Sequence, residues 1–184
     1  TKVQSIDPKG VHFQNGENSG TIKTDLILVA TGRKPNVSNL GLEELGLDFD
    51  SRGVRTDDSG ATNVPGLWAA GDVTGQAWLA HSASRMAEVV VNNLTGRKDR
   101  MRHDKMPAVV YTSPEIAVVG LTKEEAVAQG LKVRTGRIPM GINARYLAEN
   151  PGESGFCKVV LEADTRRLLG VHMVMVAFRT TGRC

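Results

Sequence analysis

The stretch NVPGLWAAGDVTGQAWLAH, from Asn63 to His81, combines three local signals in a fixed order. Val64-Pro65-Gly66 is typical of a turn, because proline fixes φ and glycine tolerates positive φ. Leu67 to Ala70 is a short apolar run between turn signals, which predicts a buried strand. After Gly71-Asp72 and a short loop, a helix is expected from Ala80. The order of strand, Gly-Asp, loop and helix predicts an α/β fold.

Apolar residues recur at helical spacing after this loop, at Ala83, Ala87 and Leu94. Gly96 stands where a C-terminal cap belongs, so we predict a helix over residues 80–95. In an open α/β sheet, ligands bind outside the carboxyl ends of the strands, where a helix N-terminus favours negative charge. Asp72 cannot bind a phosphate itself, because like charges repel. Its carboxylate is suited to accept hydrogen bonds from sugar-type hydroxyls.

Length and composition restrict the classes of function. The chain has 184 residues, 40% of them apolar and 4% aromatic, with 20 glycines and a net charge of +3. This length allows one or two domains. No apolar run approaches the about 20 residues that a membrane span needs, and the net charge is too small to indicate nucleic acid. The basic run from Arg97 to Lys105 also holds Asp99 and Asp104, so we expect a solvated linker there.

The start of the chain and its two cysteines bear on whether the chain is complete and on its redox compartment. No signal peptide is visible, and an opening on Thr1 rather than Met predicts a fragment. Cys157 and Cys184 lie far apart without metal or redox spacing, which fits a reducing compartment: the cytoplasm, or the mitochondrial matrix in a eukaryote. Cys157 alternates with its neighbours and is expected to be a small core residue. No metal site is predicted.

The first 60 residues contain several short elements. Lys2–Ile6 and Gly10–Gln14 are predicted as strands around a turn. Thr24–Ala30, with the sequence TDLILVA, has the strongest buried-strand pattern in this part of the chain. A short helix is expected over Leu40–Leu47 and a short strand over Val54–Thr56.

The second half differs in character, and we expect a boundary near residues 100–106. Thr122-Lys123-Glu124-Glu125 matches a capping box, which predicts a helix ending before Gly130. The other elements expected here are strands, the last two forming a hairpin: residues 108–111, 116–119, 132–137, 156–162 and 168–176.

Four motifs in register resemble the flavin-dependent pyridine nucleotide–disulfide oxidoreductases. They are ATGRKPN at 30–36, NVPGLWAAGDV at 63–73, LAH at 79–81 and YTSPEIAVVGLT at 111–122. The resemblance implies a partial FAD/NAD(P)-binding Rossmann-like domain followed by a partial α+β dimerisation domain. By the same resemblance, residues 1–30 are the end of the NAD-binding domain, 31–104 belong to the FAD-binding domain, and 105–184 are part of the dimerisation domain.

The resemblance also assigns binding residues for two cofactors, FAD and NAD. The Gly-Asp pair closes the FAD site in such proteins, with the Asp side chain on the ribityl chain of the flavin. The segment matching Trp78 to His81 lies against the flavin ring, and the glycine of A-T-G-R lies close to NAD. The cofactor-binding residues implied here are Gly32, Gly71, Asp72, Trp78, Leu79, Ala80 and His81.

The histidines are given no proton-transfer role. The resemblance makes His81 a packing and backbone contact at the start of the helix. His12, His103 and His172 lie in strand or linker patterns with no carboxylate partner evident in the sequence.

Several features of the family are absent from this sequence. These are the Gly-rich FAD and NAD fingerprints, the redox pair of cysteines and the His-Glu pair of the partner subunit, so no catalytic residue is assigned. The segment 175–184 departs from the family pattern and is expected to be truncated or out of frame. The resemblance implies a homodimer through residues after about 107, and the chain alone is expected to be inactive.

Two other functions stay open on the sequence. The closest resemblance is to the branch that oxidises dihydrolipoamide with NAD⁺ and works with lipoyl-bearing complexes. NADPH-linked branches that reduce glutathione disulfide or mercuric ion are an alternative, although Leu79-Ala80-His81 favours the first branch. A third possibility is a flavoprotein remnant that binds without turnover.

Overall fold

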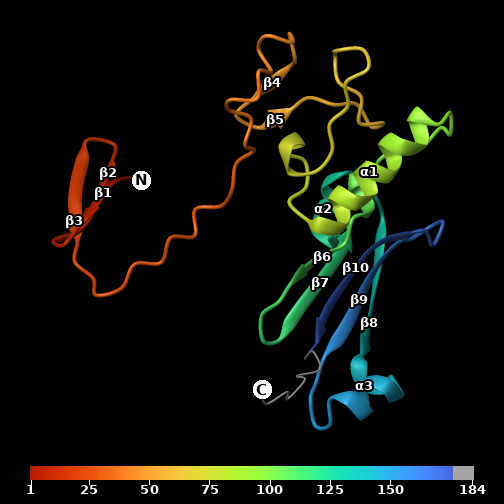
Figure 1. Cartoon of the computed structure of the whole chain (residues 1–184). Helices are drawn as coiled ribbons and strands as arrows, with labels where there is room; N and C mark the ends of the chain where they lie inside the picture. The colour runs from red at the N-terminus through yellow and green to blue at the C-terminus, as the bar shows by residue number, and fades with distance from the viewer. Residues whose placement is uncertain (176–184) are drawn as a thin grey trace, which may run out of the picture. The chain divides into compact units, whose positions relative to one another are not determined.

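The computed structural model describes residues 1–175, which divide into two compact units (Figure 1). The first unit runs from Thr1 to Arg33, and the second begins at Lys34. No helix in residues 1–175 is long and apolar enough to cross a membrane. In the same residues, no group of three or more His, Cys, Asp or Glu side chains could hold a metal ion. From the sequence, the tail 175–184 is expected to be truncated or out of frame. Residues 176–184 of this tail lie outside the described residues.

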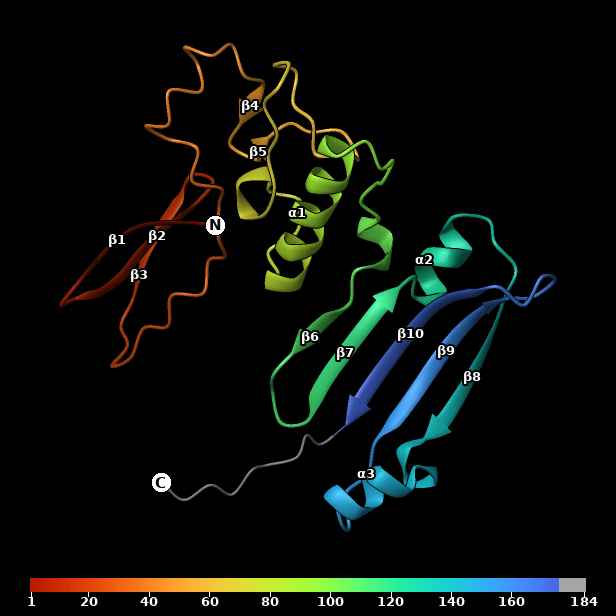
Figure 2. The same cartoon turned by 45° about the vertical axis from the view of Figure 1, so that its right-hand side comes forward.

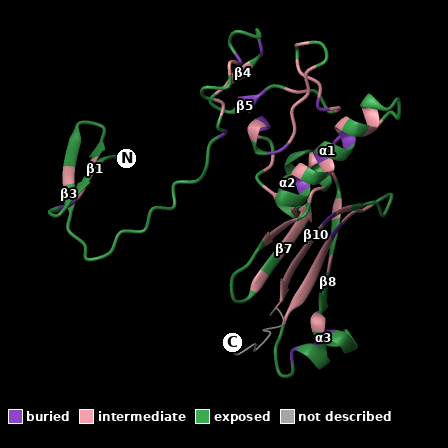
Figure 3. Ribbon diagram, viewed as in Figure 1, coloured by how far each residue is buried: buried purple, intermediate pink, exposed green. Residues whose placement is uncertain are grey.

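The first unit is a three-stranded antiparallel sheet in the order β1-β2-β3. Its strands are β1 (Lys2–Asp7), β2 (Gly10–Asn15) and β3 (Asn18–Ile22). The first two confirm the strands expected from the sequence. The third was missed because NSGTI carries no alternation of apolar and polar residues. Most side chains of this unit are exposed (Figure 3).

The strand predicted at Thr24–Ala30 is wrong. This segment is extended but has no strand partner among residues 1–175, and Leu26 and Leu28 are 85% and 87% exposed. An apolar strand is buried only when neighbouring strands take up its hydrogen bonds and cover its side chains. The apolar pattern alone is therefore insufficient for a strand, and within residues 1–175 no strand pairs with this segment.

The second unit begins with a small apolar cluster around a two-stranded hairpin. The hairpin consists of β4 (Phe49–Asp50) and β5 (Gly53–Val54), and Leu42, Leu47 and Val54 form the buried centre. Residues packed against this centre include Leu67 and Ala69. The cluster thus joins the apolar run of the opening motif to the hairpin.

Three predictions for this region need correction. Leu40–Leu47 forms turns rather than a helix, closed by a hydrogen bond of 3.0 Å from Leu47 N to Leu42 O. The glycines at 41 and 46 leave too few residues between them to propagate a helix. Leu67–Ala70 is not a strand but makes one bridge, between Ala61 and Trp68. The expected strand at Val54–Thr56 is shifted to β5, and Arg55 N instead donates to Asp48 O.

The predicted long helix is confirmed as α1 (Ala80–Leu94). Ser82, Met86 and Val89 are its buried residues and lie on one face at helical spacing. The chain leaves the helix through Thr95 and then Gly96, whose φ of 82° is left-handed. Gly96 therefore has the role that the sequence predicted for it.

The remainder of the second unit is a five-stranded sheet in the order β6-β7-β10-β9-β8, with every pairing antiparallel (Figure 2). Val160, at the centre of β9, is fully buried. The predicted strands of this half are confirmed, with small shifts of their ends. They are β6 (Ala108–Val110), β7 (Glu115–Gly120), β8 (Val133–Pro139), β9 (Phe156–Glu162) and β10 (Leu168–Met175).

Short helices lie at the two ends of this sheet (Figure 2). The helix α2 (Lys123–Ala128) confirms the predicted capping box, since Glu125 N donates to Thr122 Oγ1 and Thr122 N donates to Glu125 Oε2. At the other end, α3 (Ala144–Glu149) was not predicted. Asn143 caps it through a hydrogen bond of 3.0 Å from Tyr146 N.

Three short 3₁₀ helices also occur in the described residues: η1 (Asp72–Thr74), η2 (His103–Lys105) and η3 (Met140–Ile142).

The exposed run Leu26–Val29 predicts self-association of the 184-residue chain, because unpaired apolar strand segments pair with other copies. Substituting Leu28→Lys should increase the soluble, monomeric fraction measured by size-exclusion chromatography with light scattering. Val127→Lys, at another exposed apolar position outside the run, serves as the matched control. An equal effect of both substitutions would show that the run itself is not responsible.

Candidate functional site

The loop that follows the apolar run is held in one conformation by its own hydrogen bonds. Gly71 is buried with φ of 82°, and its carbonyl accepts from Thr74 N at 3.0 Å and from Thr74 Oγ1 at 2.8 Å. Gly75 N donates to Asp72 O at 3.0 Å, which closes the 3₁₀ turn η1. These hydrogen bonds fix the backbone conformation on both sides of Asp72.

The β4–β5 hairpin supports the loop through close backbone contact. A Cβ atom placed on Gly75 would lie 1.8 Å from Arg52 O, and one on Gly53 would lie 2.6 Å from the carbonyl carbon of Thr74. Gly75 also has a left-handed φ of 65°. No side chain fits at either position, so both glycines are required by the approach of two backbones.

Asp72 presents its carboxylate to solvent at the edge of this loop. The residue is exposed, and within residues 1–175 no donor or cation contacts its side chain. Carboxylates near a helix usually cap it or pair with a basic residue. The Asp72 oxygens are thus free to accept hydrogen bonds from a ligand.

The N-terminus of α1 follows this carboxylate by a few residues and has no side-chain cap. Its N-cap residue is Leu79, whose side chain has no hydrogen-bond acceptor. The first turn of the helix contains no Asp or Glu. Ser82 is fully buried, and its Oγ has no hydrogen-bond partner within the described part of the chain. The positive end of the α1 dipole therefore lacks a compensating group from residues 1–175 and favours an acceptor or a negative charge. Trp78, 38% exposed, adjoins this end of the helix.

His81 connects α1 to the segment that leads into the five-stranded sheet. Its Nε2 lies 2.7 Å from Pro107 O. A carbonyl only accepts, so Nε2 carries the proton and donates it to this backbone contact. The hydrogen bond ties the first turn of the helix to the residue just before β6.

His12 does have a carboxylate partner, so the sequence prediction for this residue was wrong. Its Nε2 lies 3.0 Å from Asp7 Oδ2, and its Nδ1 lies 2.8 Å from Thr21 Oγ1. The hydrogen bond from His12 lowers the pKa of Asp7 below its ordinary value. The two residues meet because the β1–β2 hairpin pairs Ser5 with His12, a register that was not read from the sequence.

The segment after α1 is clamped to the helix and is not simply solvated as predicted. Asp99 accepts from Arg85 Nη2 at 2.7 Å and from Asn92 Nδ2 at 2.8 Å, while its backbone carbonyl accepts from Asn93 Nδ2. Met101, two residues later, is 5% exposed. Hydrogen bonds from Arg85 and then Asn92 lower the pKa of Asp99 to about 2. Sequence reasoning counted the charges of this run but had no means of pairing Asp99 with a helix residue 14 positions earlier.

Two family models cover most of the chain. The model of the pyridine nucleotide-disulphide oxidoreductases matches residues 1–87, and that of the dimerisation domain of the same family matches residues 106–178. The chain belongs to the pyridine nucleotide–disulphide oxidoreductase family. The recognition and the fold class predicted from the four motifs, a partial Rossmann-like region followed by a dimerisation region, are confirmed.

The curated relatives of this chain include several dihydrolipoyl dehydrogenases. Dihydrolipoyl dehydrogenase 3 of Pseudomonas putida is 38% identical over 159 residues, which are 86% of this chain and 34% of the relative. The dihydrolipoyl dehydrogenase of Cupriavidus necator is 41% identical over 155 residues, 84% of this chain and 32% of the relative. The chain thus spans about a third of the length of these relatives.

Solved structures of the family share this fold. LpdA from Mycobacterium tuberculosis superposes with a TM-score of 0.77 at 28% identity, over 93% of this chain and 37% of that one. The HOCl-induced flavoprotein disulfide reductase RclA from Escherichia coli, in its Cu(II) complex, has a TM-score of 0.71 at 25% identity, over 91% of this chain and 39% of that one. The likeness extends over both units.

The structure brings together only some of the site residues that the family resemblance implied. Gly71 and Asp72 share one loop with Trp78, and Leu79, Ala80 and His81 follow directly at the start of α1. Gly32 belongs to the first compact unit, in an open segment with φ of 83°. Ser82 was not named from the sequence. Its position in the first turn of a predicted helix was the signal that could have identified it.

Acid should weaken the clamp between Asp99 and α1. The pKa of Asp99 is lowered in the folded chain from 3.8 to about 2. The carboxylate therefore adds to the free energy of unfolding above pH 4, and this contribution is lost as the pH falls toward 2. Asp99→Asn should therefore lower the urea midpoint of the second unit at pH 6, and its difference from the wild type should shrink at pH 2.5. Asp164→Asn, at an exposed turn position, is the control. A difference that is equal at both pH values would contradict this role of Asp99.

Proposed function

We propose that this chain is part of a dihydrolipoyl dehydrogenase, also called dihydrolipoamide dehydrogenase. Such an enzyme passes electrons from dihydrolipoamide through a protein disulfide and FAD to NAD⁺. The observation that carries the proposal is the unpartnered Asp72 carboxylate next to the uncapped start of α1, in a chain 38% and 41% identical to two dihydrolipoyl dehydrogenases.

The residues of the loop and of α1 have the chemistry that FAD requires. Asp72 accepts hydrogen bonds from hydroxyl groups of the ribityl chain, because its oxygens have no competing donor within residues 1–175. The uncapped N–H groups at the start of α1 stabilise negative charge on a ring that lies against them. Bound FAD supplies the redox chemistry by taking up two electrons and giving them to NAD⁺. The residues proposed for FAD are Gly71, Asp72, Trp78, Leu79, Ala80 and His81.

His81 has a positioning role in this proposal. Its hydrogen bond to Pro107 O occupies Nε2 and fixes the first turn of α1 against the segment before β6. A histidine held in this way orients the helix N-terminus and does not transfer a proton. Gly32 is proposed as the contact to NAD, since it has the positive φ that allows close approach of a backbone to a ligand.

The proposal extends to domains, partners and compartment. Residues 1–30 are assigned to the end of the NAD-binding domain, 31–104 to the FAD-binding domain and 105–184 to the dimerisation domain. A homodimer through residues after about 107 is supported by the match to the dimerisation-domain model. The lipoyl-bearing components of 2-oxo acid dehydrogenase complexes are the proposed partners. The proposed compartment is the cytoplasm, or the mitochondrial matrix in a eukaryote.

A chimera tests the assignment of Asp72. Residues 1–175 replace the corresponding third of Pseudomonas putida dihydrolipoyl dehydrogenase 3, and the chimera is purified with and without Asp72→Ala. Loss of an acceptor that is charged should weaken FAD binding about tenfold to a hundredfold, since such a hydrogen bond contributes about 1.5–3 kcal/mol. Flavin absorbance after dialysis and titration of the apoprotein with FAD measure the change.

Asp58→Ala is the matched control, because Asp58 is an exposed aspartate outside the loop. It should leave FAD affinity unchanged, and the unsubstituted chimera should reduce NAD⁺ with dihydrolipoamide. Equal FAD affinity in Asp72→Ala and Asp58→Ala would refute the role of Asp72. A chimera that binds FAD but does not reduce NAD⁺ with dihydrolipoamide would refute the assignment of this chain to a dihydrolipoyl dehydrogenase.

A further inference from the structure

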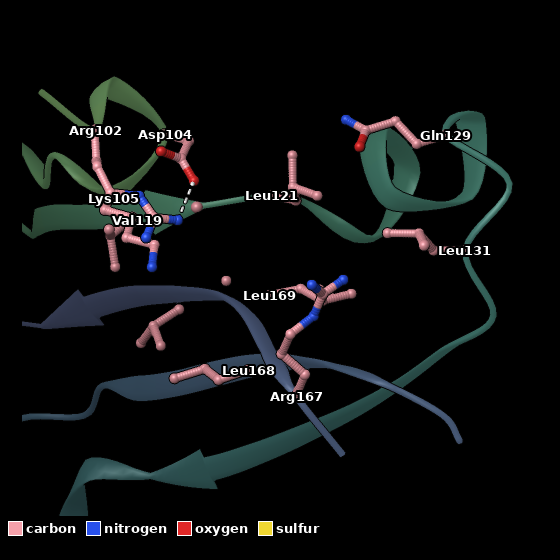
Figure 4. A pocket seen from close by; sticks show the side chains of 13 residues that line it. Arg102, Asp104, Lys105, Val119, Leu121, Gln129, Leu131, Arg167, Leu168 and Leu169 are labelled. Atoms are coloured by element: carbon pink, nitrogen blue, oxygen red, sulfur yellow. Dashed lines mark ion pairs between the residues drawn. The ribbon is translucent and has the colours of Figure 1, made fainter. Parts of the chain in front are cut away.

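A pocket of about 620 Å³ opens at the α2 end of the five-stranded sheet (Figure 4). It lies between η2, the end of α2 and the turn that joins β9 to β10. This pocket is separate from the loop and the helix start proposed for FAD, since no residue from 71 to 81 lines it. Its chemistry is therefore unexplained by the proposed function.

Positive side chains reach the pocket from two directions. Lys105 comes from η2 and Arg102 directly precedes it, while Arg167 comes from the β9–β10 turn on the opposite side (Figure 4). Asp104 is the one carboxylate among the lining residues, and it lies 3.7 Å from Arg102 Nη2. Within residues 1–175 no carboxylate pairs with Lys105. Asp104 pairs with Arg102 and Glu162 pairs with Arg167, so the three cations keep an excess of one positive charge, carried by Lys105.

Arg167 is held in place by its own turn. Its Nε lies 3.4 Å from Glu162 Oε2, its backbone N donates to Thr165 Oγ1 at 3.2 Å, and its carbonyl accepts from Glu162 N at 2.9 Å. Glu162 is itself fixed by a hydrogen bond from Thr165. The contact through Nε leaves both terminal nitrogens of the guanidinium available, and Figure 4 shows the side chain extending from the turn toward the pocket. The arginine is thus preorganised to bind an anion.

The remaining wall of the pocket is largely apolar. Leu121 is pinned to β10 by a hydrogen bond of 2.9 Å from its N to Leu169 O. Leu131 follows Gly130, and its N donates to Ala126 O in the turn that ends α2. Leu168 and Leu169 add to this surface, and Leu168 is 58% exposed. An inorganic anion would leave these leucines uncovered, whereas an organic group would bury them.

We propose that this pocket binds a small organic phosphate. Arg102, Lys105 and Arg167 surround the phosphate group, and the leucines contact the organic part. A phosphate monoester is anionic at neutral pH and offers three acceptor oxygens, which suit cations on opposite walls of the pocket and the planar donors of the arginines.

Three probes, which carry the phosphate and the apolar group together or one without the other, separate the parts of this proposal. The 184-residue chain carrying Leu28→Lys, which keeps it monomeric in our prediction, is titrated with phenyl phosphate, inorganic phosphate and benzyl alcohol at pH 7.5. Backbone amide shifts are followed by NMR. Phenyl phosphate should bind most tightly, shift residues 102–105, 129–131 and 167–171, and weaken as ionic strength rises. Shifts elsewhere, or phenyl phosphate binding no more tightly than inorganic phosphate, would overturn the proposal.

Substitutions in one turn provide the control. Arg167→Gln should weaken phenyl phosphate binding about twofold to fivefold, the range for an ion pair of a largely exposed arginine. Arg166→Gln removes the same charge from the adjacent residue, which does not line the pocket, and should leave binding close to that of the wild type. Lys105→Gln tests the opposite wall without touching the turn. Equal losses in the Arg166 and Arg167 variants, or no loss with both Arg167→Gln and Lys105→Gln, would overturn the proposal.

Discussion

The close approach of two backbones at Gly75 and Gly53 determines the geometry of the segment that we propose to bind FAD. The Arg52 carbonyl and the Gly71–Gly75 loop come so near to each other that neither glycine could carry a side chain. The loop therefore lies directly against the β4–β5 hairpin, and its own hydrogen bonds set where Asp72 and the beginning of α1 emerge. The small apolar cluster around Val54 holds the hairpin from the other side. A few residues of backbone contact thus determine where a ligand would find its acceptor and its helix N-terminus.

The helix α1 transmits this arrangement to the rest of the second unit. His81, in its first turn, bonds to the carbonyl of Pro107, while Arg85 and Asn92 bind the carboxylate of Asp99 farther along the helix. The segment between α1 and β6 is consequently fastened near both of its ends. A linker of mixed charge therefore acts as a structural connection between the proposed FAD-binding residues and the sheet of the dimerisation region.

The two candidate binding regions use different physical means to attract negative charge. At the start of α1 the attraction comes from backbone dipoles and unsatisfied N–H groups, with Asp72 available to accept from hydroxyls. In the pocket near α2 it comes from side-chain cations on opposite walls, above a surface of leucines. The first suits an extended cofactor with both hydroxyl and anionic parts, whereas the second suits a compact anion with an apolar group. Both depend on tight turns, at Gly71–Gly75 and at Glu162–Arg167.

The sequence by itself determined the elements whose signals are local. Apolar spacing and Gly96 were sufficient for α1, the Thr122–Glu125 capping box for α2, and alternation for the hairpin of β9 and β10, because each signal lies within one element. Motifs in register were sufficient for the family. The acceptor at Asp72 was proposed from its position after a Gly in an apolar run.

Tertiary structure decided whatever depends on residues distant in the sequence. TDLILVA and LWAA have the composition of strands, yet neither is one here, because a strand also needs neighbours to pair with. The clamp at Asp99, the pairing of His12 with Asp7 and the pocket that Arg167 enters all arise from register and packing. Periodicity reports which side of an element is apolar, but it does not specify the partner on that side. Contacts across the fold supply that information, and so they decided the environment of each charge.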